Sequence, residues 1–434
     1  MKKFTLILLG IVAASSVNAQ VLKLEDAIAL ALSNNHNVII TKQQNEAKKQ
    51  DIHPGAVGFF PTVDASAGGS YNASTTDQEF ATDAFPDIKN QEAAQSSQSA
   101  KVTASYMIFN GGGRVRSYAK LKSSGALSEL QTKISLESTM IQVVNSYYEV
   151  VRVGNQLDLI KGSLEISRDR LNRVKTNNSY GNAAKIDVLN AQVDFNNDSS
   201  NLMHAELNLK KSKNELNFLL GRTIVTKFDA EGELTLPVIS EASDYINKAK
   251  ENNTSIIMSN IQLGMAELDK KINKSGFMPT LSSSLDYGYQ GSANDVGIVR
   301  QSGSVGTTAA LSLKWNLFDG LKKQKALEKA KIMIEVNNTQ QQQTLLNIEK
   351  EVQNYYDAIK VNIDLLSLEK SNLTVGKINL TRSKELFKNG SINNVQFRQA
   401  QLNLIQIENK INNYKYAIKV YEYQLLRMTN ELVK

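Results

Sequence analysis

The chain contains one half-unit twice, and this duplication limits its possible folds more than any other feature. The distance between copies is 218 residues from Pro61 to Pro279 and 209 residues from Gly111 to Gly320. The first copy therefore has nine extra residues between these points, most simply in a longer loop, and the halves are equivalent structural units. The repeated motifs are Phe60-Pro61-Thr62, Ile108-Phe109-Asn110-Gly111, Asn145-Ser146-Tyr147-Tyr148 and Gly181 with Ala191-Gln192 in the first copy, and Met278-Pro279-Thr280, Leu317-Phe318-Asp319-Gly320, Gln353-Asn354-Tyr355-Tyr356 and Gly390 with Ala400-Gln401 in the second.

Residues 1–19 are predicted to be a secretory signal peptide. Lys2 and Lys3 precede an apolar run, and small residues stand at the expected cleavage site before Gln20. The chain has no cysteine, which excludes a lipid anchor on a new N-terminal cysteine, disulfides and thiolate metal sites. No later stretch approaches the roughly 18 apolar residues of a membrane-spanning helix. We therefore expect a periplasmic, extracellular or outer-membrane protein.

Charge and catalytic motifs exclude several function classes. The net charge of +7 is spread along the chain without a basic block, so nucleic-acid binding is not expected. The three histidines, His36, His53 and His204, lack the spacing of a zinc site, and no nucleophile elbow or phosphate-binding loop is present. We expect no enzymatic activity, no cofactor and no bound metal.

Each copy is predicted to contain a long helical hairpin. Proline is absent from residues 87–236 and 280–434, and apolar residues recur there at steps of three and four. Asn177-Asn178-Ser179-Tyr180-Gly181 and Lys388-Asn389-Gly390-Ser391 are polar turns with a glycine suited to ending a helix. The hairpins are expected at about 112–220 and 320–431.

Each copy is also predicted to contain a strand pair, at about 61–109 and 279–318. Apolar and polar residues alternate there over segments of about ten residues. The connecting loops are expected at about 73–100 and 290–306. Alternation alone fits a membrane β-barrel or an ordinary half-buried sheet equally, but aromatic residues near both strand ends favour the barrel. Because four strands cannot close a barrel, the monomer is incomplete.

Taken together, these motifs resemble the TolC family of outer-membrane efflux and secretion channels over almost the whole chain after residue 20. The carriers are the doubled Pro-Thr and Gly-rich motifs and Gly181 with Asp187-Val188-Leu189-Asn190-Ala191-Gln192. The resemblance implies an α+β protein in which each protomer gives four strands to a twelve-stranded barrel of a homotrimer, joined to a tunnel of helical hairpins. It places a first repeat at 20–220, an equatorial linker at 221–242 and a second repeat at 243–434. It also implies a passive exit duct in outer-membrane lipid, coupled through a periplasmic adaptor to an inner-membrane pump.

The resemblance assigns three groups of site residues. The helices that follow the turns line the periplasmic entrance; Asp187 keeps the family's acid there, whereas Gln396 and Gln399 replace acids and flank Arg398. We expect uncharged contacts and charge pairs among these residues to hold the entrance closed, although they also fit solvated positions on a helix face. The turns would meet the adaptor, or serve only to reverse the chain, and the barrel lumen is expected to be mixed in charge. The turn residues are Asn178, Tyr180, Gly181, Asn389, Gly390 and Ser391, and the lumen residues are Asp64, Lys101, Asp286 and Lys314.

Three alternatives remain open. A secreted coiled-coil or adhesive protein would explain the helices but not the strand segments at equivalent places in both copies. A periplasmic hydrolase or solute-binding protein would need a catalytic or binding constellation that the sequence lacks. A channel restricted to metal export would be expected to carry His- or Met-rich linings.

Overall fold

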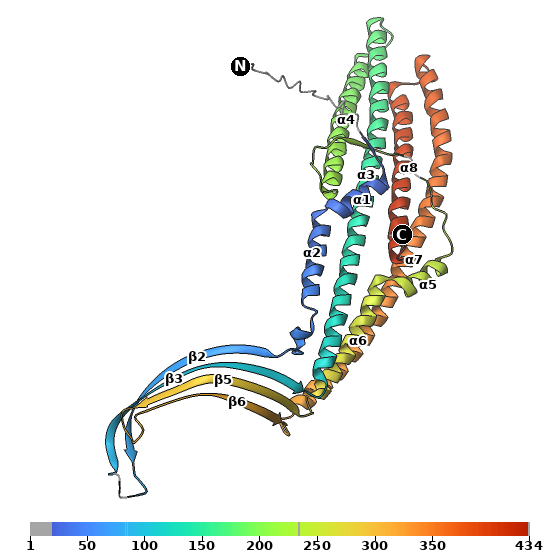
Figure 1. Cartoon of the computed structure of the whole chain (residues 1–434). Helices are drawn as coiled ribbons and strands as arrows, with labels where there is room; N and C mark the ends of the chain where they lie inside the picture. Colours follow the sequence, from blue (N-terminus) through green and yellow to red (C-terminus); the bar gives the residue numbers. More distant parts are fainter. Residues whose placement is uncertain (1–19, 83, 85, 233–234, 433–434) are drawn as a thin grey trace, which may run out of the picture. The chain divides into compact units, whose positions relative to one another are not determined.

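A computed structural model describes residues 20–82, 84, 86–232 and 235–432; the predicted signal peptide lies outside the described residues. The chain alternates short helices, strand pairs and long helical hairpins, in the same order in both halves (Figure 1). The elements are β1 (Gln20–Leu22), α1 (Leu24–Asn34), α2 (His36–Gln50), a 3-10 turn (Pro54–Val57), β2 (Thr62–Gln78), β3 (Ile88–Phe109), α3 (Gly113–Ser179), α4 (Lys185–Leu219), β4 (Phe228–Ala230), α5 (Ala242–Asn252), α6 (Thr254–Ser275), β5 (Thr280–Asn294), β6 (Gln301–Lys314), α7 (Lys322–Lys388) and α8 (Asn394–Met428).

The duplication predicted from the motifs is present in the helices. α3 and α7 both have 67 residues, and α4 and α8 both have 35. The members of each pair begin 209 residues apart, at Gly113 and Lys322 and at Lys185 and Asn394. The shorter helices α1 and α5 begin 218 residues apart, at Leu24 and Ala242. Both offsets found in the sequence are therefore offsets between whole elements.

The chain forms two compact units that do not coincide with the two repeats. We call residues 45–129 and 258–342 the sheet unit, because they contain all four long strands. The remainder, which holds the middle and far ends of the hairpins, is the helical unit. Each unit takes equivalent segments from both copies, so neither copy forms a compact body alone.

The sheet unit contains one antiparallel sheet with strand order β2-β3-β5-β6. The predicted loop at 73–100 was wrong, because β2 and β3 remain paired as far as Gln78 and Ile88. The predicted loop at 290–306 shrinks likewise, since β5 and β6 pair out to Ala293 and Gln301. Much of the extra length of the first copy is therefore strand. Its Ala, Ser, Thr and Gln residues lack the apolar alternation that marks a strand in sequence.

The register places the apolar residues of all four strands on one face. Leu285 lies opposite both Ala104 and Ala309, and Tyr287 lies opposite Val102. Residues on this face are largely exposed, among them Val63 (67%), Leu311 (68%) and Leu313 (70%). An exposed apolar sheet face of this extent is typical of a surface covered by lipid or by another chain.

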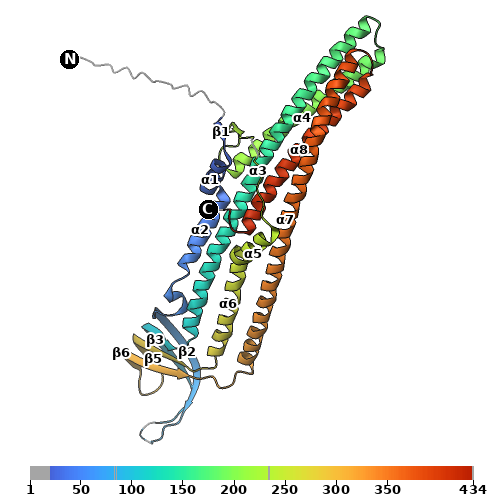
Figure 2. The same cartoon turned by 90° about the vertical axis from the view of Figure 1, so that its right-hand side faces the viewer.

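The helical unit has two equivalent cores, one in each repeat. In the first, α1, α3, α4 and β4 pack around Val143, Val144 and Phe228. In the second, α5, α6, α7 and α8 pack around Val352, Ile359 and Ile418. The linker predicted at 221–242 contributes β4, which pairs in parallel with β1. The two hairpins lie alongside each other in this unit (Figure 2).

One asparagine in each repeat joins two helices end to end. Asn35 Nδ2 donates to the carbonyl of Leu219 at the end of α4 (2.7 Å), while its Oδ1 accepts from the first turn of α2. Asn253 does the same in the second repeat, donating to Met428 O at the end of α8 (2.9 Å) and accepting from Ser255 N. A single amide thus satisfies carbonyl and N–H groups that the helix ends would leave unpaired.

Candidate functional site

The two hairpin turns have the same backbone geometry. Gly181 and Gly390 adopt left-handed φ angles of 78° and 73°, which side-chain-bearing residues rarely adopt. In each turn the residue after the glycine donates its N–H back to the preceding helix, Asn182 to Asn177 O (2.8 Å) and Ser391 to Leu386 O (2.9 Å). These bonds end α3 and α7 as predicted.

The remaining predicted turn residues surround these glycines. Asn178 Nδ2 donates to Ala183 O across the first turn (2.7 Å), whereas the Tyr180 side chain is 75% exposed. Asn389 N donates to Glu385 O in the second turn (3.1 Å). The two turns therefore differ at the surface, since the first displays an aromatic ring.

Three of the four predicted entrance residues engage their own helix. Asp187 Oδ2 accepts from Ala184 N at the start of α4 (3.3 Å), and Gln396 Oε1 accepts from Asn393 N at the start of α8 (3.1 Å). Gln399 Nε2 donates to Asn403 Oδ1 one turn further along α8 (2.8 Å). Asp187 and Gln396 thus act as equivalent N-terminal caps.

Arg398 joins the second repeat to the first. Its guanidinium donates to both carboxylate oxygens of Asp198 on α4, Nη1 to Oδ2 and Nη2 to Oδ1, each at 2.7 Å. Ser167 of α3 also donates to that carboxylate. Asp198 is buried (4% exposed), and bidentate pairs of this kind are among the stronger polar contacts in proteins. The structure therefore pairs Arg398 with Asp198 instead of Asp187.

A second arginine completes this cluster. Arg170 of α3 has a fully buried side chain and donates from Nη2 to Asp194 Oδ2 (2.7 Å), and Asp194 also lies 4.0 Å from Arg398. Burial lowers the pKa of Arg170, and its Nε and Nη1 atoms have no hydrogen-bond partner. We call Arg170, Asp194, Asp198 and Arg398 the charge cluster.

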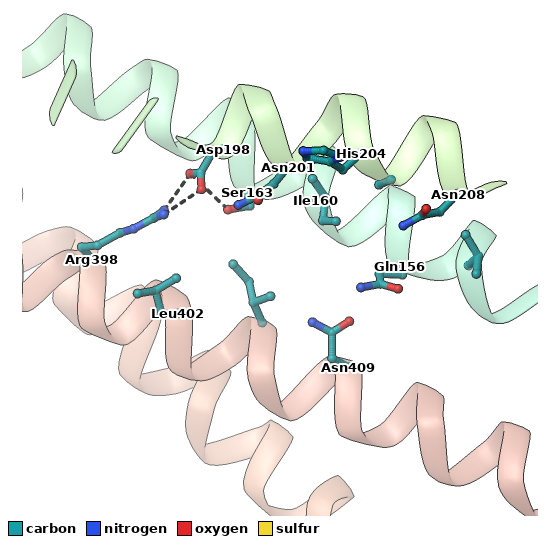
Figure 3. A pocket seen from close by; sticks show the side chains of 13 residues that line it. Gln156, Ile160, Ser163, Asp198, Asn201, His204, Asn208, Arg398, Leu402 and Asn409 are labelled. Carbon is teal, nitrogen blue, oxygen red and sulfur yellow. Dashed lines mark hydrogen bonds and ion pairs between the residues drawn. The ribbon is translucent and has the colours of Figure 1, made fainter. Parts of the chain in front are cut away.

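A cavity of about 340 Å³ adjoins the charge cluster, between α3, α4 and α8 (Figure 3). Asp198 and Arg398 close one end of it, joined by their ion pair, and His204 lies on the α4 wall. The remaining polar lining consists mainly of amides: Gln156, Asn201, Asn208 and Asn409. Amide side chains can donate and accept hydrogen bonds without carrying charge.

The four predicted lumen residues share the polar face of the sheet. Asp64 and Asp286 both lie opposite Thr103, and Asp286 accepts from Thr103 Oγ1 (2.5 Å). Lys101 lies 4.0 Å from Asp286 across the β3–β5 pair. Lys314 lies opposite Thr280 at the helix end of the sheet. Opposite charges on this face are therefore paired within one chain.

Sequence reasoning missed Arg170, Asp194 and Asp198. One signal was available: Ala191, Asp198 and Ala205 are spaced by seven residues, and all three are buried. A carboxylate at a repeating buried position of a helix requires a partner. The identity of that partner lies 200 residues away in sequence and could not be found from spacing.

Comparison with known proteins decides the family. The family model described as "Outer membrane efflux protein" matches residues 27–222 and 245–431, one segment in each repeat. The chain belongs to this family. The TolC outer membrane protein of Vibrio cholerae is 22% identical over 170 residues, which cover 39% of each chain, so the matched region spans well under half of that relative.

Solved structures share the fold. The CmeC outer membrane channel of Campylobacter jejuni is 17% identical, with a TM-score of 0.79 over 95% of this chain and 86% of that one. A membrane protein of Pseudomonas aeruginosa is 16% identical, with a TM-score of 0.77 over 94% and 93%. Family membership confirms the predicted resemblance, the α+β fold with two repeats, and an outer-membrane location extending into the periplasm. It also confirms that the chain is not an enzyme.

The described part of the chain contains no helix that is both long and apolar enough to cross a membrane.

Proposed function

We propose that the chain is one subunit of a homotrimeric exit duct, which a periplasmic adaptor couples to an inner-membrane pump. In this proposal three copies close one twelve-stranded barrel, and α4 and α8 line the periplasmic entrance. The observation that carries it is the four-stranded sheet with an exposed apolar face and two unpaired edges. The polar face, with Asp64, Lys101, Asp286 and Lys314, would line the lumen.

The unpaired edges support closure by further copies. β2 and β6 each pair on one side only, and each unpaired backbone group in hydrocarbon costs several kcal/mol. Since the sheet has an even number of antiparallel strands, β2 runs opposite to β6. The β2 edge of one copy can therefore continue the antiparallel pattern along the β6 edge of the next.

The helical unit carries two exposed seams that fit the same arrangement. On α4 and on α7, exposed apolar residues recur at alternating steps of three and four, the spacing of a coiled-coil contact. One seam on each helix leads to a head-to-tail interface, which closes into a ring. The seam residues are Ile186, Leu189, Val193, Met203 and Leu207 on α4, and Val361, Leu368, Val375 and Ile378 on α7.

The two seams also match in height. Val193 stands twelve residues after Gly181, and Ile378 stands twelve residues before Gly390. Met203 and Leu368 are each 22 residues from the same glycines. Because both turn glycines end equivalent helices, antiparallel packing of α4 against a neighbour's α7 brings apolar residues together.

Cysteine cross-linking tests this interface on a chain that has no cysteine of its own. We expect Val193→Cys combined with Ile378→Cys to give covalent dimers and trimers on non-reducing gels after mild oxidation, since such a bond needs Cα atoms within about 7 Å. Val193→Cys combined with Val361→Cys is the control, because Val361 lies about 25 Å further along α7. Equal cross-linking of both pairs would argue against the matched interface.

Channel activity tests the function itself. The purified protein in planar lipid bilayers should give discrete conductance steps of one size, as expected for a single closed pore. An absence of conductance from protein that is trimeric by sedimentation would contradict the exit duct. Soluble behaviour without detergent would instead favour the coiled-coil alternative.

A further inference from the structure

A second cavity lies beside the hairpin turns. It has a volume of about 590 Å³ and is bounded by the end of α3, the end of α7 and the start of α8. We call it the tip cavity. Four of its lining residues are cations and only one, Asp169, is an acid. The cations are Arg170, Arg173, Lys384 and Lys388.

Few carboxylates balance these cations. Lys388 pairs with the exposed Glu385 at 3.4 Å, a contact of the kind that contributes little in water. In the two helix ends that form the walls, residues 166–177 and 382–388, seven Lys or Arg residues face two Asp or Glu residues. The tip cavity is therefore a region of positive potential.

Arg170 adds an independent sign that an anion is missing. Its side chain is fully buried at the cavity wall, yet it pairs through Nη2 alone and leaves Nε and Nη1 without partners. Unpaired donors on a buried guanidinium are unusual in folded proteins. An additional negative charge in the cavity would offset the cost of burying this cation.

The apolar part of the cavity favours a polypeptide over a small free anion. Phe387 and Phe397 stack with ring centroids 5.1 Å apart and both line the tip cavity. The exposed ring of Tyr180 lies in the neighbouring turn. Cationic side chains around an aromatic floor suit a side chain that carries a carboxylate on an aliphatic stem.

We propose that the tip cavity receives an Asp or Glu side chain from the hairpin turn of the periplasmic partner. This inference rests on the proposed function, because the partner that meets the turns is the adaptor. It specifies the adaptor's chemistry: an acidic tip, chosen by charge complementarity with this chain. Arg173 and Lys384, which are exposed at the mouth, steer the carboxylate inward.

Three synthetic helical hairpins that differ only in their turn test the proposal. One carries Asp and Glu, one Asn and Gln, and one Lys. Fluorescence anisotropy with the purified full-length protein should show the acidic hairpin binding at least about tenfold more tightly than the neutral one. This preference should shrink as salt is raised, because exposed charges are screened.

Charge reversal at the mouth should invert the preference. Arg173→Glu with Lys384→Glu is expected to remove the preference for the acidic hairpin and to favour the Lys hairpin instead. Arg168→Glu with Lys175→Glu makes the same change in net charge on exposed residues of α3 that do not line the cavity. This control pair should keep most of the acidic preference.

Three results would overturn the inference. The first is equal binding of the acidic and neutral hairpins, and the second is an equal loss in the control pair. The third is complete displacement of the acidic hairpin by millimolar inorganic phosphate, which would mark a site for free anions. Bilayer conductance separates this outcome from the proposed function. Normal conductance without an acidic preference removes only the tip cavity proposal, whereas absent conductance removes the exit duct and leaves the binding result interpretable.

Discussion

Asp198→Asn is expected to destabilise the helical unit by about 3–5 kcal/mol, the usual cost of removing one partner from a buried ion pair. The change leaves the carboxylate's shape but removes its charge, so Arg398 and the fully buried Arg170 would share Asp194 alone. Thermal unfolding followed by helical circular dichroism should show the transition at a clearly lower temperature. In bilayers the same variant should open more readily, because the cluster ties α8 to α3 and α4 beside the proposed entrance.

Asp187→Asn is the matched control for this prediction. It makes the same chemical change on the same helix, eleven residues earlier, at a carboxylate that caps only its own helix. The expected loss is below about 1 kcal/mol, because asparagine is also a capping residue. If the two variants lost the same stability, the charge cluster would not be the main tie between the repeats.

A double variant separates the ion pair from the shape of the site. Arg398→Met in the Asp198→Asn background removes the uncompensated cation, and an apolar residue of similar length can pack in its place. We expect part of the lost stability to return. Continued instability would indicate that Asn at position 198 fails for a reason other than charge.

Ala309→Arg is expected to have the other large effect, on the sheet. Ala309 lies in the middle of β6, opposite Leu285 on the exposed apolar face. If this face meets lipid, arginine there costs about 2–4 kcal/mol in each subunit. Folded trimer recovered from outer membranes, and its resistance to guanidinium in lipid vesicles, should both fall steeply.

Thr308→Arg provides the comparison one residue away. Successive residues of a strand point to opposite faces, and Thr308 lies opposite Asp286 on the polar face. An arginine there gains a carboxylate neighbour in the proposed lumen, so insertion should be nearly normal. Equal damage from both substitutions would contradict the assignment of faces.

The sequence predicted the helices much better than the outer parts of the strands. Motif offsets and the absence of proline placed α3 and α7 within a few residues of their bounds, because long helices repeat a strong pattern. The stretch from Ala73 to Ala94 was predicted as loop although most of it is paired strand. Small polar residues on both faces leave no alternation, so only pairing with the neighbouring strand identifies them.

The candidate site was predicted in position but not in contacts. Gly181 and Gly390 were identified as turn residues because each ends a helix locally, and the structure confirms this. Arg398 was identified as an unusual residue near the entrance, but its partner Asp198 comes from the other repeat. Local spacing carries information about neighbours within about one helical turn, whereas the charge cluster depends on how two hairpins pack.

The amide joints at Asn35 and Asn253 give the two sides of each repeat different mechanical properties. One side is a single unbroken helix of 67 residues, held by a continuous ladder of backbone hydrogen bonds. On the other side, two shorter helices meet at one asparagine, and a few hydrogen bonds hold the joint. Bending is therefore cheapest at the joint, with the long helix acting as the spring that restores it. The joints occur at equivalent places in both repeats, so a ring of three subunits would carry six of them at one level and could flex like a collar.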